Sequence, residues 1–413
     1  MQKIISPFIF LFVSVWLINL GGGLQGTLLG MRATLESFDV TETGIVMSSY
    51  FIGYIISIMI VPRFINAVGH IRSFAAFASL CSAVTLSHAV FVDPVSWFVF
   101  RSITGVCFGG LVLIVESWLN ASVSNENRGT VFASYMLVIF SAAAISQTLL
   151  NLTSIQGYDL FVLVSVILSL SVLPLSLGKR IHAPEIKTAQ RKPLLLMLKH
   201  HPLGTLGVFV AGLLSGALWA MTPVFMIRSD YAASEVSIAM FCLMVGGTLA
   251  FWPIGKLSDM IDRRKVILGL TVMTFVVSIT HFLAGSSSPS LFYVLVGLLG
   301  FVSFPIYAVC ASHINDYLEA DEFISACSTM VVLYGCGAFL APLLSSTFMS
   351  FFGVDGFFAY LATAQIPLIA FATYRIAKKD VLAAEDRTDF VYDVPKVTPT
   401  VNPLDPRNVE IED

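Results

Sequence analysis

Twelve apolar runs, each close to the length needed to cross a bilayer, recur along this chain of 413 residues. A helix needs about 20 predominantly apolar residues to span the hydrocarbon core. With 56% hydrophobic and only 12% charged residues, the composition excludes a soluble protein and predicts an all-α membrane protein of twelve transmembrane helices. We place the runs at about 7–30, 44–62, 74–91, 95–119, 131–152, 158–177, 203–227, 236–255, 266–284, 291–314, 323–350 and 357–376.

The distribution of positive charge predicts the orientation of these helices. Of the 23 Lys and Arg residues, only Arg32 and Arg228 fall in loops on the side opposite the termini, and Arg101 falls inside a run. Cytoplasmic loops carry an excess of Lys and Arg. We therefore expect both termini in the cytoplasm, and we interpret the first apolar run as a retained helix and not a cleaved signal.

The chain divides at residues 178–202, a stretch rich in Lys, Arg, Pro and His that we interpret as a cytoplasmic linker. On this reading, residues 1–177 and 203–376 each form a six-helix bundle. Matches recur at an offset of about 195 residues, such as His88 with His281 and Gly105 with Gly300, which indicates an internal duplication. Residues 377–413 lose the apolar pattern and are predicted to be a disordered cytoplasmic tail.

The fourth run carries charges that a lipid-facing helix would not hold. At 100° per residue, Arg101, Gly105, Gly109 and Glu116 fall on one face of a helix. An ionisable group inside a membrane is costly, so this face is expected to turn toward protein or a wet cavity. The two glycines would let another helix backbone approach beside the arginine.

Arg101 lies about 10 Å into this run, counted from Pro94 at its outer end. Its counterpart in the second half is Val296, so the duplicated fold does not require a charge at this position. We predict that Arg101 holds an anionic or polar group of a substrate, or biases a nearby acid. The alternative is an arginine satisfied by backbone carbonyls in a helix interface.

Glu116 is the one acid well inside a run, and two roles remain open for it. It lies about one turn from the cytoplasmic end, near Arg72 and Arg128, so it could form an inner-gate salt bridge. It could instead carry a proton, because removal from water raises the pKa of a carboxyl group.

Further polar and aromatic residues inside the runs suit a small-molecule pocket. For Gln25 an interhelical hydrogen bond is the alternative. Tyr and Trp are also common at membrane interfaces, but Trp219, Tyr307 and Tyr334 fall well inside their runs. The candidates for substrate binding are Gln25, Tyr50, Gln147, Trp219, Tyr307 and Tyr334.

The segment Gly255-Lys-Leu-Ser-Asp259-Met-Ile-Asp-Arg263-Arg264-Lys265 resembles the loop between the second and third helices of each half in the major facilitator superfamily. The spacing of Arg101, Gly105 and Gly109 resembles the fourth-helix motif of that family. The resemblance covers residues 1–376 and implies two helix bundles, alternating access and a substrate site between the halves. It also implies that Asp259, together with Arg263, Arg264, Arg72 and Arg128, acts as a conformational latch at the cytoplasmic side.

One departure from the family and one further resemblance refine this interpretation. The fifth run reads Ile139–Gln147 without the glycine-proline-glycine signature of drug antiporters, which disfavours multidrug efflux. The loop Val68-Gly-His-Ile-Arg72 resembles the bacterial YcaD-like branch.

We therefore predict a monomeric secondary transporter of a small organic solute, driven by protons, in the bacterial cytoplasmic membrane. Drug or metabolite efflux is the alternative within transport, and a non-transporting membrane sensor is the alternative of another class. No nucleophile cluster, phosphate-binding loop or metal-ligand spacing is found, so we expect no enzyme, cofactor or metal site.

Overall fold

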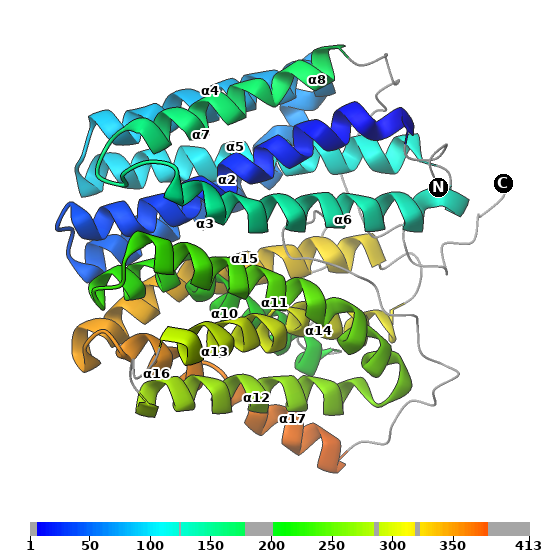
Figure 1. The fold of residues 1–413 in the computed structure, drawn as a ribbon. Helices are drawn as coiled ribbons and strands as arrows, with labels where there is room; N and C mark the ends of the chain where they lie inside the picture. Colours follow the sequence, from blue (N-terminus) through cyan, green and yellow to red (C-terminus); the bar gives the residue numbers. More distant parts are fainter. Residues whose placement is uncertain (1–5, 124, 178–200, 285–288, 319–322, 379–413) are drawn as a thin grey trace.

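The computed structural model describes residues 6–123, 125–177, 201–284, 289–318 and 323–378, and these residues form helices joined by short turns (Figure 1). The predicted linker between residues 178 and 200 and the tail after residue 378 lie outside this description. The helices are η1 Ser6–Phe8, α2 Ile9–Leu35, α3 Val40–Val68, α4 His70–Val90, α5 Pro94–Ser122, α6 Asn125–Thr148, η2 Leu149–Asn151, α7 Asp159–Leu170, α8 Val172–Leu177, α10 Pro202–Arg228, α11 Ala233–Met260, α12 Arg263–Ala284, α13 Pro289–Ser303, α14 Pro305–Asn315, α15 Phe323–Phe352, α16 Gly356–Thr363 and α17 Ile366–Lys378.

These helices build twelve spans that are long and apolar enough to cross a membrane, which confirms the predicted fold class. Three spans are interrupted, between α7 and α8, between α13 and α14, and between α16 and α17. The break before α14 falls at Pro305, which has no N–H to continue the helix hydrogen bonds. Outside these breaks the spans begin and end within a few residues of the predicted runs.

Local sequence signals fix where several helices begin. Asp39 accepts a hydrogen bond from the Thr41 amide at 2.9 Å, and Glu42 accepts one from the Asp39 amide at 2.9 Å, so they cap α3 reciprocally. Asp93 caps α5 with a single hydrogen bond, which it accepts from the Ser96 amide at 2.9 Å. These caps lie at one end of the molecule, which we call the loop end: residues 36–39, 91–93, 152–158, 229–232 and 353–355.

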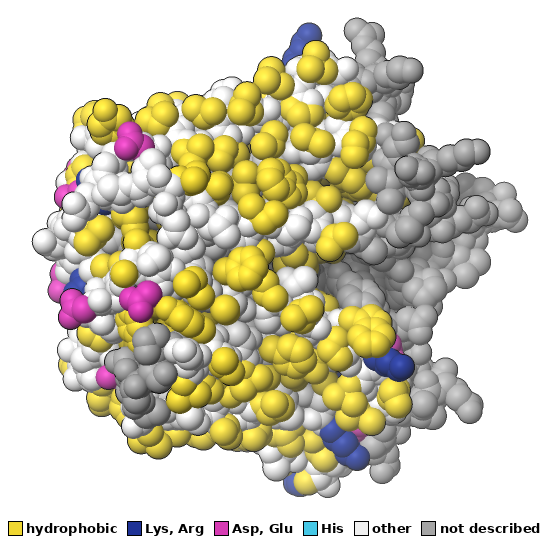
Figure 2. All heavy atoms as spheres, viewed as in Figure 1, with side chains coloured by type: hydrophobic (Ala, Val, Ile, Leu, Met, Phe, Trp, Pro, Cys, Tyr) yellow, Lys and Arg dark blue, Asp and Glu magenta, His cyan; other side chains and the backbone are white. Residues whose placement is uncertain are grey.

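Figure 1 shows α2–α8 grouped in one part of the molecule and α10–α17 in the other, with the start of α2 and the end of α17 opposite the loop end. We call that opposite side the termini end. Across the middle of the face seen in Figure 2, apolar side chains predominate, while charged side chains gather toward the two ends. A broad apolar surface of this kind fits contact with lipid and not with water.

The glycines of α5 let its backbone touch that of α3. A Cβ built on Gly105 would lie 1.9 Å from the Tyr50 carbonyl oxygen, and one on Gly53 would lie 1.8 Å from that of Ser102. No side chain fits at such distances without moving a helix. The predicted close approach beside Arg101 is therefore present, and it fixes how α5 is rotated toward α3.

Replacing Gly105 with alanine is expected to destabilise the protein by about 1–3 kcal/mol, because the added methyl overpacks a rigid backbone contact. The measurement is the apparent melting temperature of purified protein in detergent. Gly269→Ala is the control, since nothing lies within 4 Å of its Cβ position in the exposed face of α12. The control should be neutral or slightly stabilising, because alanine favours a helix over glycine. Equal melting temperatures for both variants would contradict the close contact.

Candidate substrate-binding site

A cavity lies between the two groups of helices, with a volume of about 1090 Å³ that includes the open space at its mouth. It is lined from the first group by Asn19, Gly22, Gly23, Gly26, Met47, Tyr50, Phe51, Tyr54, Arg101, Phe108, Val112 and Ala143, and from the second by Trp219, Ala220, Val331, Tyr334 and Gly335. Both groups of helices therefore contribute walls, as a site between two moving halves requires.

Arg101 is the charged residue of this lining, and its side chain is only 7% exposed. Its guanidinium carbon lies 4.7 Å from the centre of the Tyr50 ring, in cation–π geometry. Its Nε atom is buried and has no hydrogen-bond acceptor. The ion pairs among the described residues involve Arg32, Arg263 and Arg264 but not Arg101. Arg101 is thus a buried cation that can still donate hydrogen bonds to a ligand.

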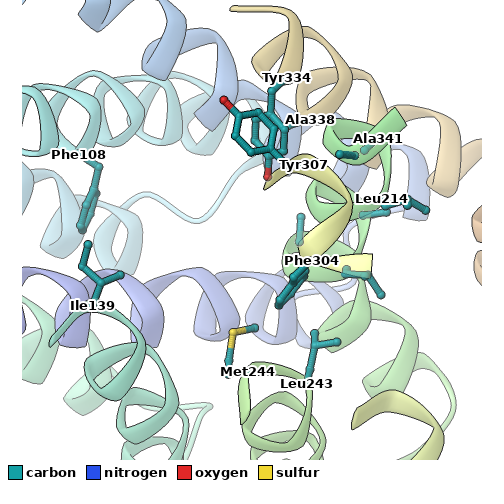
Figure 3. Close-up of a cluster of buried hydrophobic side chains, with 14 of the residues drawn as sticks. Phe108, Ile139, Leu214, Leu243, Met244, Phe304, Tyr307, Tyr334, Ala338 and Ala341 are labelled. Atoms are coloured by element: carbon teal, nitrogen blue, oxygen red, sulfur yellow. The ribbon is translucent and has the colours of Figure 1, made fainter. Parts of the chain in front are cut away.

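Aromatic rings form most of the remaining wall. Tyr50 packs edge-on against Phe51 with ring centres 5.3 Å apart, and Tyr54 and Phe108 lie beside it at 6.2 and 6.4 Å. On the opposite wall Trp219 stacks on Phe304 at 6.1 Å with an interplanar angle of 11°. Figure 3 shows Phe108 and Tyr334 on opposite sides of an open space. The cavity therefore offers flat apolar surfaces beside a single cation.

Glu116 lies on the same helix as Arg101 but outside the lining. It is completely buried, and Tyr135 of α6 donates a hydrogen bond to its Oε1 at 3.2 Å. Val112 lines the cavity four residues before Glu116 on the same helix, so this buried carboxyl lies about one helical turn from the lining. The sequence suggested two salt-bridge partners for Glu116. Arg72 is exposed, and the side chain of Arg128 lies outside the described residues.

Four of the seven predicted substrate-binding residues, Arg101, Tyr50, Trp219 and Tyr334, line the cavity. The other three, Gln25, Gln147 and Tyr307, are buried in helix contacts outside the lining. Gln25 donates to the Thr85 hydroxyl at 2.9 Å, and Gln147 accepts from the Thr27 hydroxyl at 2.8 Å. For Gln25 the structure therefore favours the interhelical hydrogen bond that the sequence left open, and Gln147 makes an interhelical hydrogen bond as well.

Tyr307 lies behind the aromatic wall of the cavity and outside its lining. Its ring packs edge-on against that of Tyr334 with centres 5.4 Å apart, so it supports a lining residue (Figure 3). Met47 and Phe51 also line the cavity, although they were not among the predicted residues. The sequence of α3 could have predicted these lining residues. Met47, Tyr50, Phe51 and Tyr54 occur at spacings of three and four residues and therefore share one helix face.

Charged residues of the proposed latch gather at the termini end of the second half. Arg263 is buried, and its Nε lies 3.0 Å from Asp316 Oδ2 while its Nη2 lies 3.4 Å from Asp259 Oδ1. Arg264 pairs with Asp262 at 2.8 Å. Arg263 thus ties the start of α12 to the end of α14. The latch role of Asp259, with Arg72 and Arg128, stays a prediction.

The two groups of helices are joined by hydrogen bonds at the loop end. Arg228 Nη2 donates to the Phe38 carbonyl at 2.6 Å. Ser237 of α11 donates to the Gln147 carbonyl at 2.6 Å and accepts from Asn151 Nδ2 at 3.0 Å. The pKa of Asp39 is lowered by the Thr41 amide and also by the charge of Arg228 on the other half. The cavity is therefore closed toward the loop end.

Replacing Ser237 with alanine removes two of these bonds and is expected to weaken the closure by about 1–3 kcal/mol, at roughly 0.5–1.5 kcal/mol per bond. Spin labels on Thr41→Cys and Ser234→Cys, in a Cys336→Ser background, should show a longer distance component in the variant. Thr280→Ala is the control, because that hydroxyl bonds only to its own helix at Val276. An unchanged distance distribution would argue against the closure.

Twelve spans and a cavity between two groups of helices define a multi-pass membrane transporter fold. The chain matches the profile of the Major Facilitator Superfamily over residues 11–232 and 204–389, and it belongs to that family. This is a family of transporters and not of enzymes, as the sequence predicted.

Relatives in enterobacteria match across most of the chain. The Uncharacterized MFS-type transporter YcaD of Escherichia fergusonii is 25% identical over 364 residues, which cover 87% of this chain and 93% of the relative. An Uncharacterized MFS-type transporter of Yersinia pseudotuberculosis is 26% identical over 363 residues, covering 86% and 92%. The predicted resemblance to this branch is therefore confirmed.

Solved structures share the fold at low sequence identity. The nucleoside transporter NupG superposes with a TM-score of 0.73 at 15% identity and covers 90% of this chain and 99% of its own. A bacterial homologue of the human lysosomal transporter Spinster, in an inward-facing and occupied conformation, gives 0.71 at 14% identity and covers 94% and 99%.

Proposed function

We propose that this protein is a proton-coupled secondary transporter that moves a small organic solute across the bacterial cytoplasmic membrane by alternating access. The observation that carries the proposal is the cavity between the two groups of helices, which is closed toward the loop end. It presents the buried Arg101, which has no ion-pair partner among the described residues. A site of this kind, sealed on one side, fits a carrier that exposes its substrate to each side in turn.

The charge distribution supports a cytoplasmic termini end, and the structure would then correspond to an inward-facing state. One fold neighbour is described as inward-facing and occupied, which agrees with closure at the loop end. Another is named a nucleoside transporter, and the aromatic walls of the cavity in this protein suit a planar solute.

Glu116 supports proton coupling. Of the described acidic residues, it alone has no exposed surface, and it lies about one helical turn from Val112 of the cavity wall. In the proposed cycle this carboxyl binds a proton in one conformation and releases it in the other. Binding and release of a proton can therefore follow the opening of the cavity to each side.

The test is transport by purified protein in liposomes. The vesicles are offered a defined mixture of metabolites, with and without an imposed pH gradient, and their contents are analysed by mass spectrometry. We expect at least one solute to accumulate above its external level only with the gradient, and a protonophore should abolish this. Contents equal to those of protein-free vesicles, in both directions of the gradient, would refute the proposal.

The orientation is tested separately by reporter fusions. Fusions at residues 190 and 385 are both expected to report from the cytoplasm, because nearly all Lys and Arg outside the spans belong to that side. A fusion after Ser229, in the turn between α10 and α11, should report from the opposite side. A periplasmic signal at residue 190 or 385 would overturn the assigned orientation.

A further inference from the structure

The charge balance of the cavity limits what can bind in it. Arg101 is 7% exposed and its buried Nε lacks an acceptor. No Asp, Glu or Lys belongs to the described lining. A buried cation without a counterion is costly, and a bound anion that accepts from its planar fork removes that cost. A cationic ligand would add a second positive charge, and a neutral ligand would leave the first unpaired.

The walls limit the shape of the ligand's remaining part. Tyr50 lies 4.7 Å below the guanidinium, so the cation and the first aromatic surface adjoin each other. Phe108 and Tyr334 flank the open space, and Trp219 is held flat by stacking on Phe304. Flat rings on both sides favour an apolar, planar ligand body through stacking.

Resting on the transporter function proposed above, we propose that the substrate is an aromatic monocarboxylate, with its carboxylate on Arg101 and its ring between the aromatic walls. One unpaired guanidinium matches one carboxylate. The ring would lie against Tyr50 and reach toward Trp219 on the other half, so that the ligand contacts both halves at once.

The test is calorimetric binding to the purified full-length protein with four probes: naphthoate, its neutral amide naphthamide, the cation naphthylmethylamine, and acetate. Naphthoate is expected to bind at least about 10-fold more tightly than naphthamide, because hydrogen bonds to a charged group are lost in the amide. The cation should not bind, and acetate should bind much more weakly because it has no ring to stack.

In Arg101→Gln the preference for naphthoate over naphthamide should fall to about one, whereas Arg63→Gln, an exposed arginine of α3, should keep it. If Arg101→Gln fails to fold, the relative affinities of the four probes for the unmodified protein still test the proposed anion site. Equal binding of naphthoate and naphthamide, or an unchanged preference in Arg101→Gln, would overturn the proposal.

Transport measurements separate this inference from the proposed function. Accumulation of a neutral or cationic solute by protein that does not bind naphthoate would refute the substrate class and leave the transporter function standing. Tight binding of naphthoate without flux of any solute would refute transport and leave the anion site standing.

Discussion

Arg101→Ala and Arg101→Lys are both expected to lose transport, by about 10- to 100-fold in initial rate, while the protein still inserts and purifies as a single species. Alanine removes the charge from the cavity. Lysine keeps the charge but lacks the planar fork that donates two parallel hydrogen bonds, so it cannot replace Arg101. The rate is measured as solute uptake by proteoliposomes at matched protein content.

The same substitution should not lower stability. Within the described part of the chain, Arg101 is buried without an ion pair or an acceptor for its Nε, so its removal takes away a desolvation cost. We expect the apparent melting temperature of Arg101→Ala to be unchanged or higher. Arg63→Ala, on the exposed face of α3, serves as the control and should retain both transport and stability. Full uptake by Arg101→Ala, or its failure to fold, would contradict a role in binding.

Glu116→Gln is expected to abolish accumulation driven by a pH gradient and to spare counterflow exchange of the solute. Glutamine has nearly the shape of a protonated glutamate, so it can still accept from Tyr135, but it cannot release a proton. Exchange needs only the movement of the loaded carrier, whereas net accumulation needs the proton step. Both are measured in the same proteoliposomes, with and without an imposed gradient.

Tyr135→Phe is the matched variant for Glu116. It removes the 3.2 Å hydrogen bond but leaves the carboxyl able to titrate, so gradient-driven accumulation should persist with a shifted pH dependence. Loss of both accumulation and exchange in Glu116→Gln would instead support the inner-gate role that the sequence left open.

The amino-acid sequence by itself determined the fold class and the spans of this protein. A run of about 20 apolar residues has one stable outcome in lipid, because a helix satisfies its own backbone hydrogen bonds. That constraint is local, so each transmembrane helix can be predicted from its own residues without knowing which helices pack against it. Placement of Arg101 on a face with Gly105 and Gly109 is equally local, since it follows from the helix period.

Only the tertiary structure decided which polar residues reach the cavity. Hydropathy does not fix the rotation of a helix that is surrounded by other helices, and α2 is such a helix: Gln25 faces Thr85 of α4, whereas Gly26 faces Arg101. One residue along a helix turns a side chain by about 100°, from an interface into the cavity. The close backbone contact of Gly105 with Tyr50 sets that rotation for α5.

Closure of the loop end likewise depends on tertiary contacts. Arg228 and Phe38 are 190 residues apart in the chain, and the bond between them joins a side chain to a backbone carbonyl, which carries no sequence signal. The break before α14 depends on both local sequence and tertiary packing. Pro305 predicts its position in the sequence, while packing decides the direction in which the helix bends there. Local composition therefore fixes the spans, and the packing of one half against the other fixes the site.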